Sequence, residues 1–216
     1  MDFGNVIGDS FAYAKEGLVG KWMKWILLLI ATILLTLPLM GYMLKILRGE
    51  KPAPEVENWG TLFIDGIKYL IIAIIYAIPL IIIMALAMAP VVAAAISGDT
   101  NMAMASIGAF LVGLLVFVIV AIIIGLFEVI GIVRFARTGS MGEAFNFSEI
   151  LATIGKIGWV TYIIALIIMG IIIGIIELIC LMIPVVGGII LFILIPFVTL
   201  FESRYICLLY DSAGSA

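Results

Sequence analysis

The sequence has no histidine and little charge, and both absences narrow the functions open to it. Histidine is the commonest general base and nitrogen ligand for metals, so chemistry that depends on imidazole is excluded. Asp, Glu, Lys and Arg make up 12% of the 216 residues, and the formal net charge is −3. A chain without a polybasic patch lacks the electrostatic footprint of a nucleic-acid binder. We therefore expect no nucleic-acid partner.

Cysteine is scarce, and catalytic motifs are absent. Cys180 and Cys207 fall at predicted depths near opposite faces of a membrane. A disulfide between them is not expected, because bridged Cα atoms lie within about 7 Å of each other. The sequence contains no GxSxG elbow, no P-loop, no zinc-ligand spacing and no CxxC pair. We expect a protein that is not an enzyme and uses no cofactor and no bound metal.

Apolar residues are what the sequence has in excess, at 66% of the chain. Soluble domains are about half apolar, so the solvent for most of this chain is lipid. A membrane-crossing helix needs ~20 apolar residues. Lipid offers no partner to open backbone groups, and nothing here alternates like a barrel strand, so an all-α integral membrane protein is expected. The long apolar stretches are 25–44, 69–96, 102–133, 157–183 and 188–210.

Ten of the eleven basic residues lie in the segments 1–24, 45–68 and 134–156. The short turns 97–101 and 184–188 contain no Lys or Arg. Since cytoplasmic loops carry the excess of basic residues, 45–68, 134–156 and the C-terminus are predicted to be cytoplasmic in the cell membrane. The N-terminal residues lack the basic start and apolar run of a signal peptide, so they are expected to be retained.

Two parts of the chain repeat the same order of features. Arg48 precedes Lys68 by 20 residues, and Arg137 precedes Lys156 by 19. Between the members of each pair lie a polar loop and a short amphipathic helix, whose packing against lipid or against protein stays open. We predict a single polytopic domain with two pseudo-repeated transmembrane hairpins, each preceded by an amphipathic interfacial helix. The predicted parts are an interfacial helix at 1–20, a first element at 22–48, and hairpin units at 56–137 and 144–210.

The first apolar element, 22–48, has two interpretations. Its length suits one span with an external N-terminus. Basic residues at both of its ends favour instead a half-depth re-entrant hairpin with an internal N-terminus and its tip at Leu37 and Pro38. The side of the membrane on which the N-terminus lies therefore stays open.

A set of short motifs lies along most of the chain: Gly41-Tyr42, Arg48-Gly49-Glu50, Pro54-Glu55, Trp59-Gly60, 62–66, 76–79, 134–136 and 145–147. In these residues the chain resembles a family of archaeal and bacterial multi-pass membrane proteins classed as a domain of unknown function, number 4013 in its series. The resemblance implies membrane residence and no assigned activity, and it supplies no site residues. An isoleucine content far above average also favours an archaeal source.

Charged groups within apolar stretches are costly, so each is a candidate for function. Glu177 lies seven residues before Pro184, about 10 Å below the outer turn at ~1.5 Å per residue. Its own helix offers no nearby cation. A protonated carboxyl bonded to the backbone, an ion or proton site, and an oligomer-interface hydrogen bond all fit this position. Glu177 is the candidate ion or proton site.

Two further carboxylates have arginines within a few residues. Glu128 and Glu202 occupy equivalent positions in the predicted repeat, with Arg134 and Arg204 close by in sequence. We expect structural ion pairs that cross between the hairpins, Glu128 with Arg204 and Glu202 with Arg134. Removing one partner of such a pair would leave a buried charge unpaired.

Small residues at helical spacing predict close helix packing, either within one chain or between subunits. A bundle this small, with isolated carboxylates, has little room for a substrate cavity of its own, so we expect a homo-oligomer in the lipid bilayer. A channel or carrier for ions or small solutes is one hypothesis, and a scaffold that organises lipid or partner proteins is the alternative. The small residues are Gly170, Gly174, Ala105, Ala109 and Gly113.

Overall fold

The computed structural model describes residues 2–214, which form helices joined by short connections and contain no strand. The all-α class predicted from the sequence is confirmed. The chain divides into two compact units. The first contains the described residues up to Leu70 and those from Val129 onward, and the second is Ile71–Glu128.

Four helices are long and apolar enough to cross a membrane: α4 (Trp59–Ser97), α5 (Thr100–Thr138), α7 (Trp159–Leu181) and α8 (Val186–Asp211). Helices α4 and α5 have 39 residues each, which corresponds to about 58 Å at 1.5 Å per residue. Because about 20 residues suffice for a span, both exceed the thickness of the hydrocarbon. These helices are those of a multi-pass membrane protein.

The first apolar element does not form one continuous helix. Helix α2 (Trp22–Ile33) and helix α3 (Leu37–Leu47) are separated by a break in which Leu35 and Thr36 adopt φ of 55° and 62°. Left-handed backbone at non-glycine residues ends a helix. With 12 and 11 residues, each helix is shorter than the ~20 residues of a span. The depth of this element and the side of the N-terminus stay predictions.

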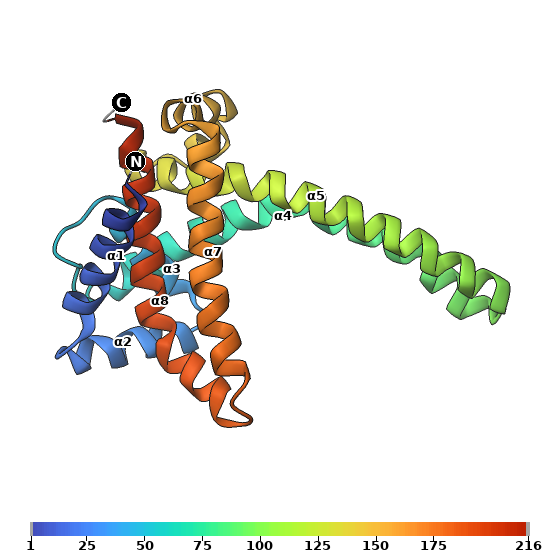
Figure 1. Ribbon diagram of the computed structural model, residues 1–216, viewed down its shortest axis with the longest axis horizontal. Coiled ribbons are helices and arrows are strands. Elements are labelled where there is room, and N and C mark those ends of the chain that lie inside the picture. The colour runs from blue at the N-terminus through green and yellow to red at the C-terminus, as the bar shows by residue number, and fades with distance from the viewer. Residues whose placement is uncertain (1, 215–216) are drawn as a thin grey trace. The chain divides into compact units, whose positions relative to one another are not determined.

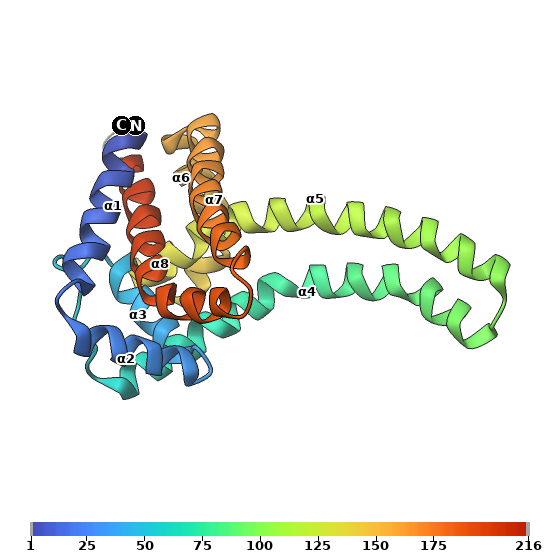
Figure 2. The same ribbon diagram turned by 60° about the horizontal axis from the view of Figure 1, so that its bottom comes forward.

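The first unit is built around α8. Helix α1 (Phe3–Leu18) runs along α8, and α7 packs against α8 as a hairpin (Figures 1 and 2). Helices α2 and α3 also contact α8. The approach of α1 is close at Gly17, where an added Cβ would lie 2.8 Å from a Leu200 methyl group and 2.9 Å from Ala53 Cβ. Only glycine allows that spacing.

Helices α3 and α4 cross in the first unit with backbone against backbone. An added Cβ at Gly41 would lie 2.1 Å from the carbonyl oxygen of Leu62, and one at Gly66 would lie 1.9 Å from that of Leu37. Backbone atoms cannot move aside as a flexible side chain can. Glycine at both positions therefore sets how closely the two helices approach.

A short polar connection links α5 to the α7–α8 hairpin. It contains the 3₁₀ helix η1 (Met141–Phe145) and helix α6 (Phe147–Ile157), and a second 3₁₀ helix, η2 (Ser212–Gly214), follows α8. The Asn146 side chain accepts the backbone N–H of Glu149 and caps α6. Gly158, with φ of 92°, separates α6 from α7. This left-handed residue lets the chain turn from one helix into the next.

The second unit, Ile71–Glu128, exposes most of its apolar side chains. None of the most apolar 18-residue window of α5 is buried. Its arms meet at Gly113, where an added Cβ would lie 2.4 Å from Ala87 Cβ. Ala94 and Ser106 are also buried. Apart from Ile72 and Tyr76, which are also buried, the unit is therefore a hairpin with small residues inside and large aliphatic residues outside.

Candidate functional site: a cavity in the α7–α8 hairpin

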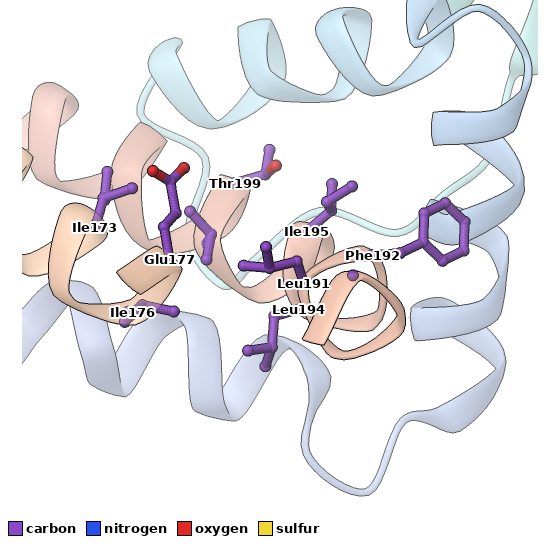
Figure 3. Close-up of a pocket in the computed structure, with 10 residues that line it drawn as sticks. Ile173, Ile176, Glu177, Leu191, Phe192, Leu194, Ile195 and Thr199 are labelled. Carbon is purple, nitrogen blue, oxygen red and sulfur yellow. The ribbon is translucent and has the colours of Figure 1, made fainter. Parts of the chain in front are cut away.

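A cavity of about 450 Å³ lies between α7 and α8. Most of its wall is apolar, with aliphatic side chains from both helices and the Phe192 ring. Its two polar side chains are Glu177 from α7 and Thr199 from α8, and Figure 3 shows both among the aliphatic residues. Small-molecule sites have this character, mainly apolar with few polar groups.

Glu177 brings the negative charge of this cavity. It lies four residues before the end of α7 at Leu181, in the last turn of that helix. Its side chain is exposed, and among residues 2–214 it makes no ion pair. A carboxylate in an apolar setting is stabilised by a cation bound beside it.

Polar residues continue along α8 beyond the cavity. Thr199 and Ser203 are buried and lie four residues apart, hence on one helix face. Glu202 and Arg204 flank Ser203. The Ser203 hydroxyl is buried and has no hydrogen-bond partner within the described residues. We call these four residues the α8 polar series; it leads from the cavity to the ionic contacts of α1.

Arg204 is the buried charge at the end of the α8 polar series. It is 2% exposed, its Nε donates a hydrogen bond of 2.7 Å to Asp9 on α1, and its guanidinium lies 5.3 Å from the centre of the Tyr13 ring. Lys51 also pairs with Asp9, at 3.5 Å. The hydrogen bond from Arg204 holds the pKa of Asp9 below its ordinary value. Helix α1 therefore supplies the counter-ion of a buried arginine.

The structure corrects the predicted partners of the two arginines. Arg204 pairs with Asp9 in place of Glu128. Arg134 pairs with Glu143 and, at 3.7 Å, with Glu149, in place of Glu202. Glu143 and Glu149 follow Arg134 closely along the chain, so the loop that the pair closes is short and costs little entropy. The hydrogen bond from Arg134 also lowers the pKa of Glu143.

Two arginines lock α3 to the end of α5. Arg48 Nε donates to the carbonyl oxygen of Ala136 at 3.3 Å, and Arg137 Nε donates to that of Leu47 at 2.7 Å. Each arginine thus binds the residue that precedes the other one. The contact joins positions that the predicted repeat treats as equivalent. The repeat itself stays a prediction.

These arginines also hold carboxylates. Arg48 pairs with Asp65 at 2.6 Å, and Arg137 pairs with Asp211 at 2.7 Å. These pairs were not predicted from the sequence, and neither were Asp9 and Thr199 as site residues. A charged residue in a connecting segment is ordinary in sequence, and its partner lies far along the chain. For Thr199, the signal was available: it is a polar residue one helical turn from Glu202.

The chain matches one family among known proteins. The model of the family described as "Protein of unknown function (DUF4013)" matches residues 25–185, most of the chain. The chain belongs to this family. No curated protein and no solved structure matches it. The resemblance read from the sequence is thereby confirmed.

The family match includes some of the candidate site and leaves out the rest. Glu177 lies within the matched residues 25–185, together with the arginine contact of Arg48 and Arg137. Helix α1 and helix α8, with the α8 polar series, lie outside it. The family description names no activity.

The small residues predicted to pack helices have different surroundings. Gly113 packs inside the second unit against Ala87, whereas Ala105 and Ala109 are exposed. Gly170 and Gly174 are exposed on α7, and a Cβ added at either would meet nothing within 4 Å in the described chain.

No group of three or more Cys, Asp or Glu side chains able to hold a metal ion occurs in residues 2–214.

Proposed function

We propose that this protein is a non-enzymatic membrane carrier or channel for ions or small solutes, with Glu177 as the group that binds the transported species. The observation that carries the proposal is the position of this carboxylate, in a cavity between two membrane-length helices and without an ion pair among the described residues. An ionisable residue within a membrane-spanning helix is energetically costly, and such residues commonly mark the binding site or path of an ion or substrate. The α8 polar series extends from Thr199 in the cavity along α8 to Arg204.

Proteoliposomes that contain a pH-sensitive dye test this proposal, since the proton is the simplest ion a carboxylate can bind. We expect the purified protein to dissipate an imposed pH gradient. Glu177→Gln should lower that flux on the order of tenfold or more, because the amide keeps the shape and loses the charge. The matched control is Glu57→Gln, an exposed residue of the connection between α3 and α4. Flux equal to that of empty liposomes both for protons and for an organic cation, or flux unchanged in Glu177→Gln, would contradict the proposal.

We also propose that the protein works as a homo-oligomer in the cell membrane, with its C-terminus in the cytoplasm. The open space beside Gly170 and Gly174 on α7 supports an interface, since small residues let helices of two copies approach. Light-scattering mass in detergent measures the number of copies. Gly170→Leu should lower that mass, and a monomeric mass for the unmodified protein would refute the oligomer.

A scaffold that organises lipid or partner proteins is the second candidate function. The observation that favours it is the second unit, whose large aliphatic side chains are mostly exposed. A photo-crosslinking amino acid placed at Ile122, which is 61% exposed, reports its neighbours in native membranes. Adducts to a protein partner, together with absent flux, would favour the scaffold over the carrier.

A further inference from the structure

The α7–α8 cavity has the size and wall of a site for an organic molecule. Its volume of about 450 Å³ lies within the ~300–1,000 Å³ of small-molecule sites. Leu191, Ile195 and Val198 from α8 and Ile173 and Ile176 from α7 provide aliphatic wall. Such a wall binds apolar groups by removing their surface from water. A small hydrated ion alone would leave this surface without a partner.

The charge of the cavity is negative. The lining includes one carboxylate, Glu177, and no Lys or Arg. An anion such as a phosphate or fatty acid headgroup would be repelled, and a neutral apolar molecule would leave Glu177 without a counter-charge. The complementary ligand is therefore positively charged.

The number of polar ligands separates organic from inorganic cations. Calcium takes six to eight oxygen ligands, and magnesium requires an octahedral set. The cavity offers the Glu177 carboxylate and the Thr199 hydroxyl. A bare metal ion would lack most of its ligands here. An organic cation needs one counter-charge and apolar contacts for the rest of its surface.

We propose that the α7–α8 cavity binds an amphiphilic organic monocation, an amine or quaternary onium ion with an apolar body, with its charge at Glu177 and its body against the aliphatic wall. This inference rests on the proposed transport function and names the class of its solute. Thr199, on the opposite helix, offers a polar contact beside the charge.

Equilibrium dialysis with tetraphenylphosphonium on the purified full-length protein in neutral-lipid nanodiscs tests the site. We expect saturable binding, with a dissociation constant raised on the order of tenfold or more by Glu177→Gln and unchanged by Glu57→Gln. After subtraction of the uptake by empty nanodiscs, which the interfacial dipole potential makes different for the two ions, tetraphenylborate, which has the same shape and the opposite charge, should show weaker saturable binding than tetraphenylphosphonium. Equal binding of the two ions, or equal binding to the unmodified protein and Glu177→Gln, would overturn the proposal.

A second variant keeps the test decisive if Glu177→Gln does not fold. Ile195→Trp fills the cavity from α8 and keeps the carboxylate. It should abolish saturable tetraphenylphosphonium binding, with the helical circular-dichroism signal and the gel-filtration profile unchanged. Retained binding in a folded Ile195→Trp protein would place the ligand elsewhere and overturn the proposal.

Measurements of flux and of binding distinguish the organic-cation site from the proposed transport function. Proton flux that depends on Glu177, without tetraphenylphosphonium binding, would refute the organic-cation site and leave transport standing. Binding that depends on Glu177, without flux of protons or of tetraphenylphosphonium, would refute transport and leave the site standing.

Discussion

The two units of this chain are both rich in apolar residues but bury them to different extents. In the first unit, side chains such as Leu28, Tyr42 and Ile150 are fully buried, and ion pairs join distant segments. In the second, Ile71–Glu128, side chains such as Ile119 and Ile122 are exposed, and small residues line its inside. The first unit contains a packed core, and the second leaves most of its large aliphatic side chains exposed.

This difference shows that hydropathy does not reveal packing in a membrane protein. Lipid is as apolar as leucine, so aliphatic residues face it without cost. Specific structure depends on close backbone approach and on satisfied polar groups instead. Substitutions of the same type in the two units should therefore have unequal effects on stability.

The largest difference in unfolding free energy is expected between Gly66→Ala in the first unit and Gly108→Ala in the second. At Gly66 the added methyl group would lie 1.9 Å from the Leu37 carbonyl oxygen, whereas at Gly108 it would meet nothing within 4 Å. Gly66→Ala should cost about 4 kcal/mol or more of unfolding free energy, because backbone has to move. Gly108→Ala should be neutral or stabilising by up to about 1 kcal/mol through helix propensity. Thermal unfolding in detergent measures both, and similar shifts would remove the contrast between the units.

The next largest difference in unfolding free energy is expected between Ile150→Ala and Ile122→Ala. Ile150 is 0% exposed on α6, and Ile122 is 61% exposed on α5. Truncation of a buried isoleucine should cost about 2–4 kcal/mol, because it leaves a cavity. The exposed one should change stability by about 0.5 kcal/mol or less. Urea or thermal unfolding of both variants measures these changes. A large loss of unfolding free energy for Ile122→Ala would mean that this face of α5 is covered.

Asp9→Asn should lower stability by about 1–2 kcal/mol, because Arg204 loses its charged acceptor. The effect is limited because the Asp9 side chain is 42% exposed and its charge is screened by water. Arg204 holds the pKa of Asp9 below its ordinary 3.8. The contribution is therefore complete above about pH 4 and is lost as the pH falls through the lowered value.

Acid unfolding measured by circular dichroism checks this sign. Stability of the unmodified protein should fall below about pH 4 toward that of Asp9→Asn, and the variant should lack this component. Lys51→Ala is a milder companion change, since its ion pair with Asp9 is longer, at 3.5 Å. Equal acid sensitivity in Asp9→Asn and the unmodified protein would show that the pair adds no stability.

The smallest effect is expected for Tyr42→Phe, also in the first unit. The Tyr42 hydroxyl donates a buried hydrogen bond of 2.8 Å to the Pro54 carbonyl oxygen. Its removal should cost about 1 kcal/mol, since the ring still packs and the carbonyl loses its partner. Tyr210→Phe keeps its ring beside Arg137 and serves as the control. Thermal unfolding compares the two, and equal stability would mean that water replaces the lost donor.

Much of the fold was accessible from the sequence because membrane helices follow from local properties. The long apolar runs predict α4, α5, α7 and α8, since span length and backbone hydrogen bonding leave no alternative to helix. Glu177 stood out as a candidate because a carboxylate within such a run is rare. Asp9 did not, because an acidic residue in an amphipathic N-terminal helix is ordinary until α8 brings Arg204 against it.

The sequence by itself determined that the protein is a helical membrane protein and marked the costly charge at Glu177, since hydropathy and charge act residue by residue. Only the tertiary structure decided which carboxylate neutralises each arginine, that 22–48 breaks into two helices, and that Glu177 lines a cavity with Thr199. These features depend on residues far apart in the chain, and their energies arise only when packing brings them together.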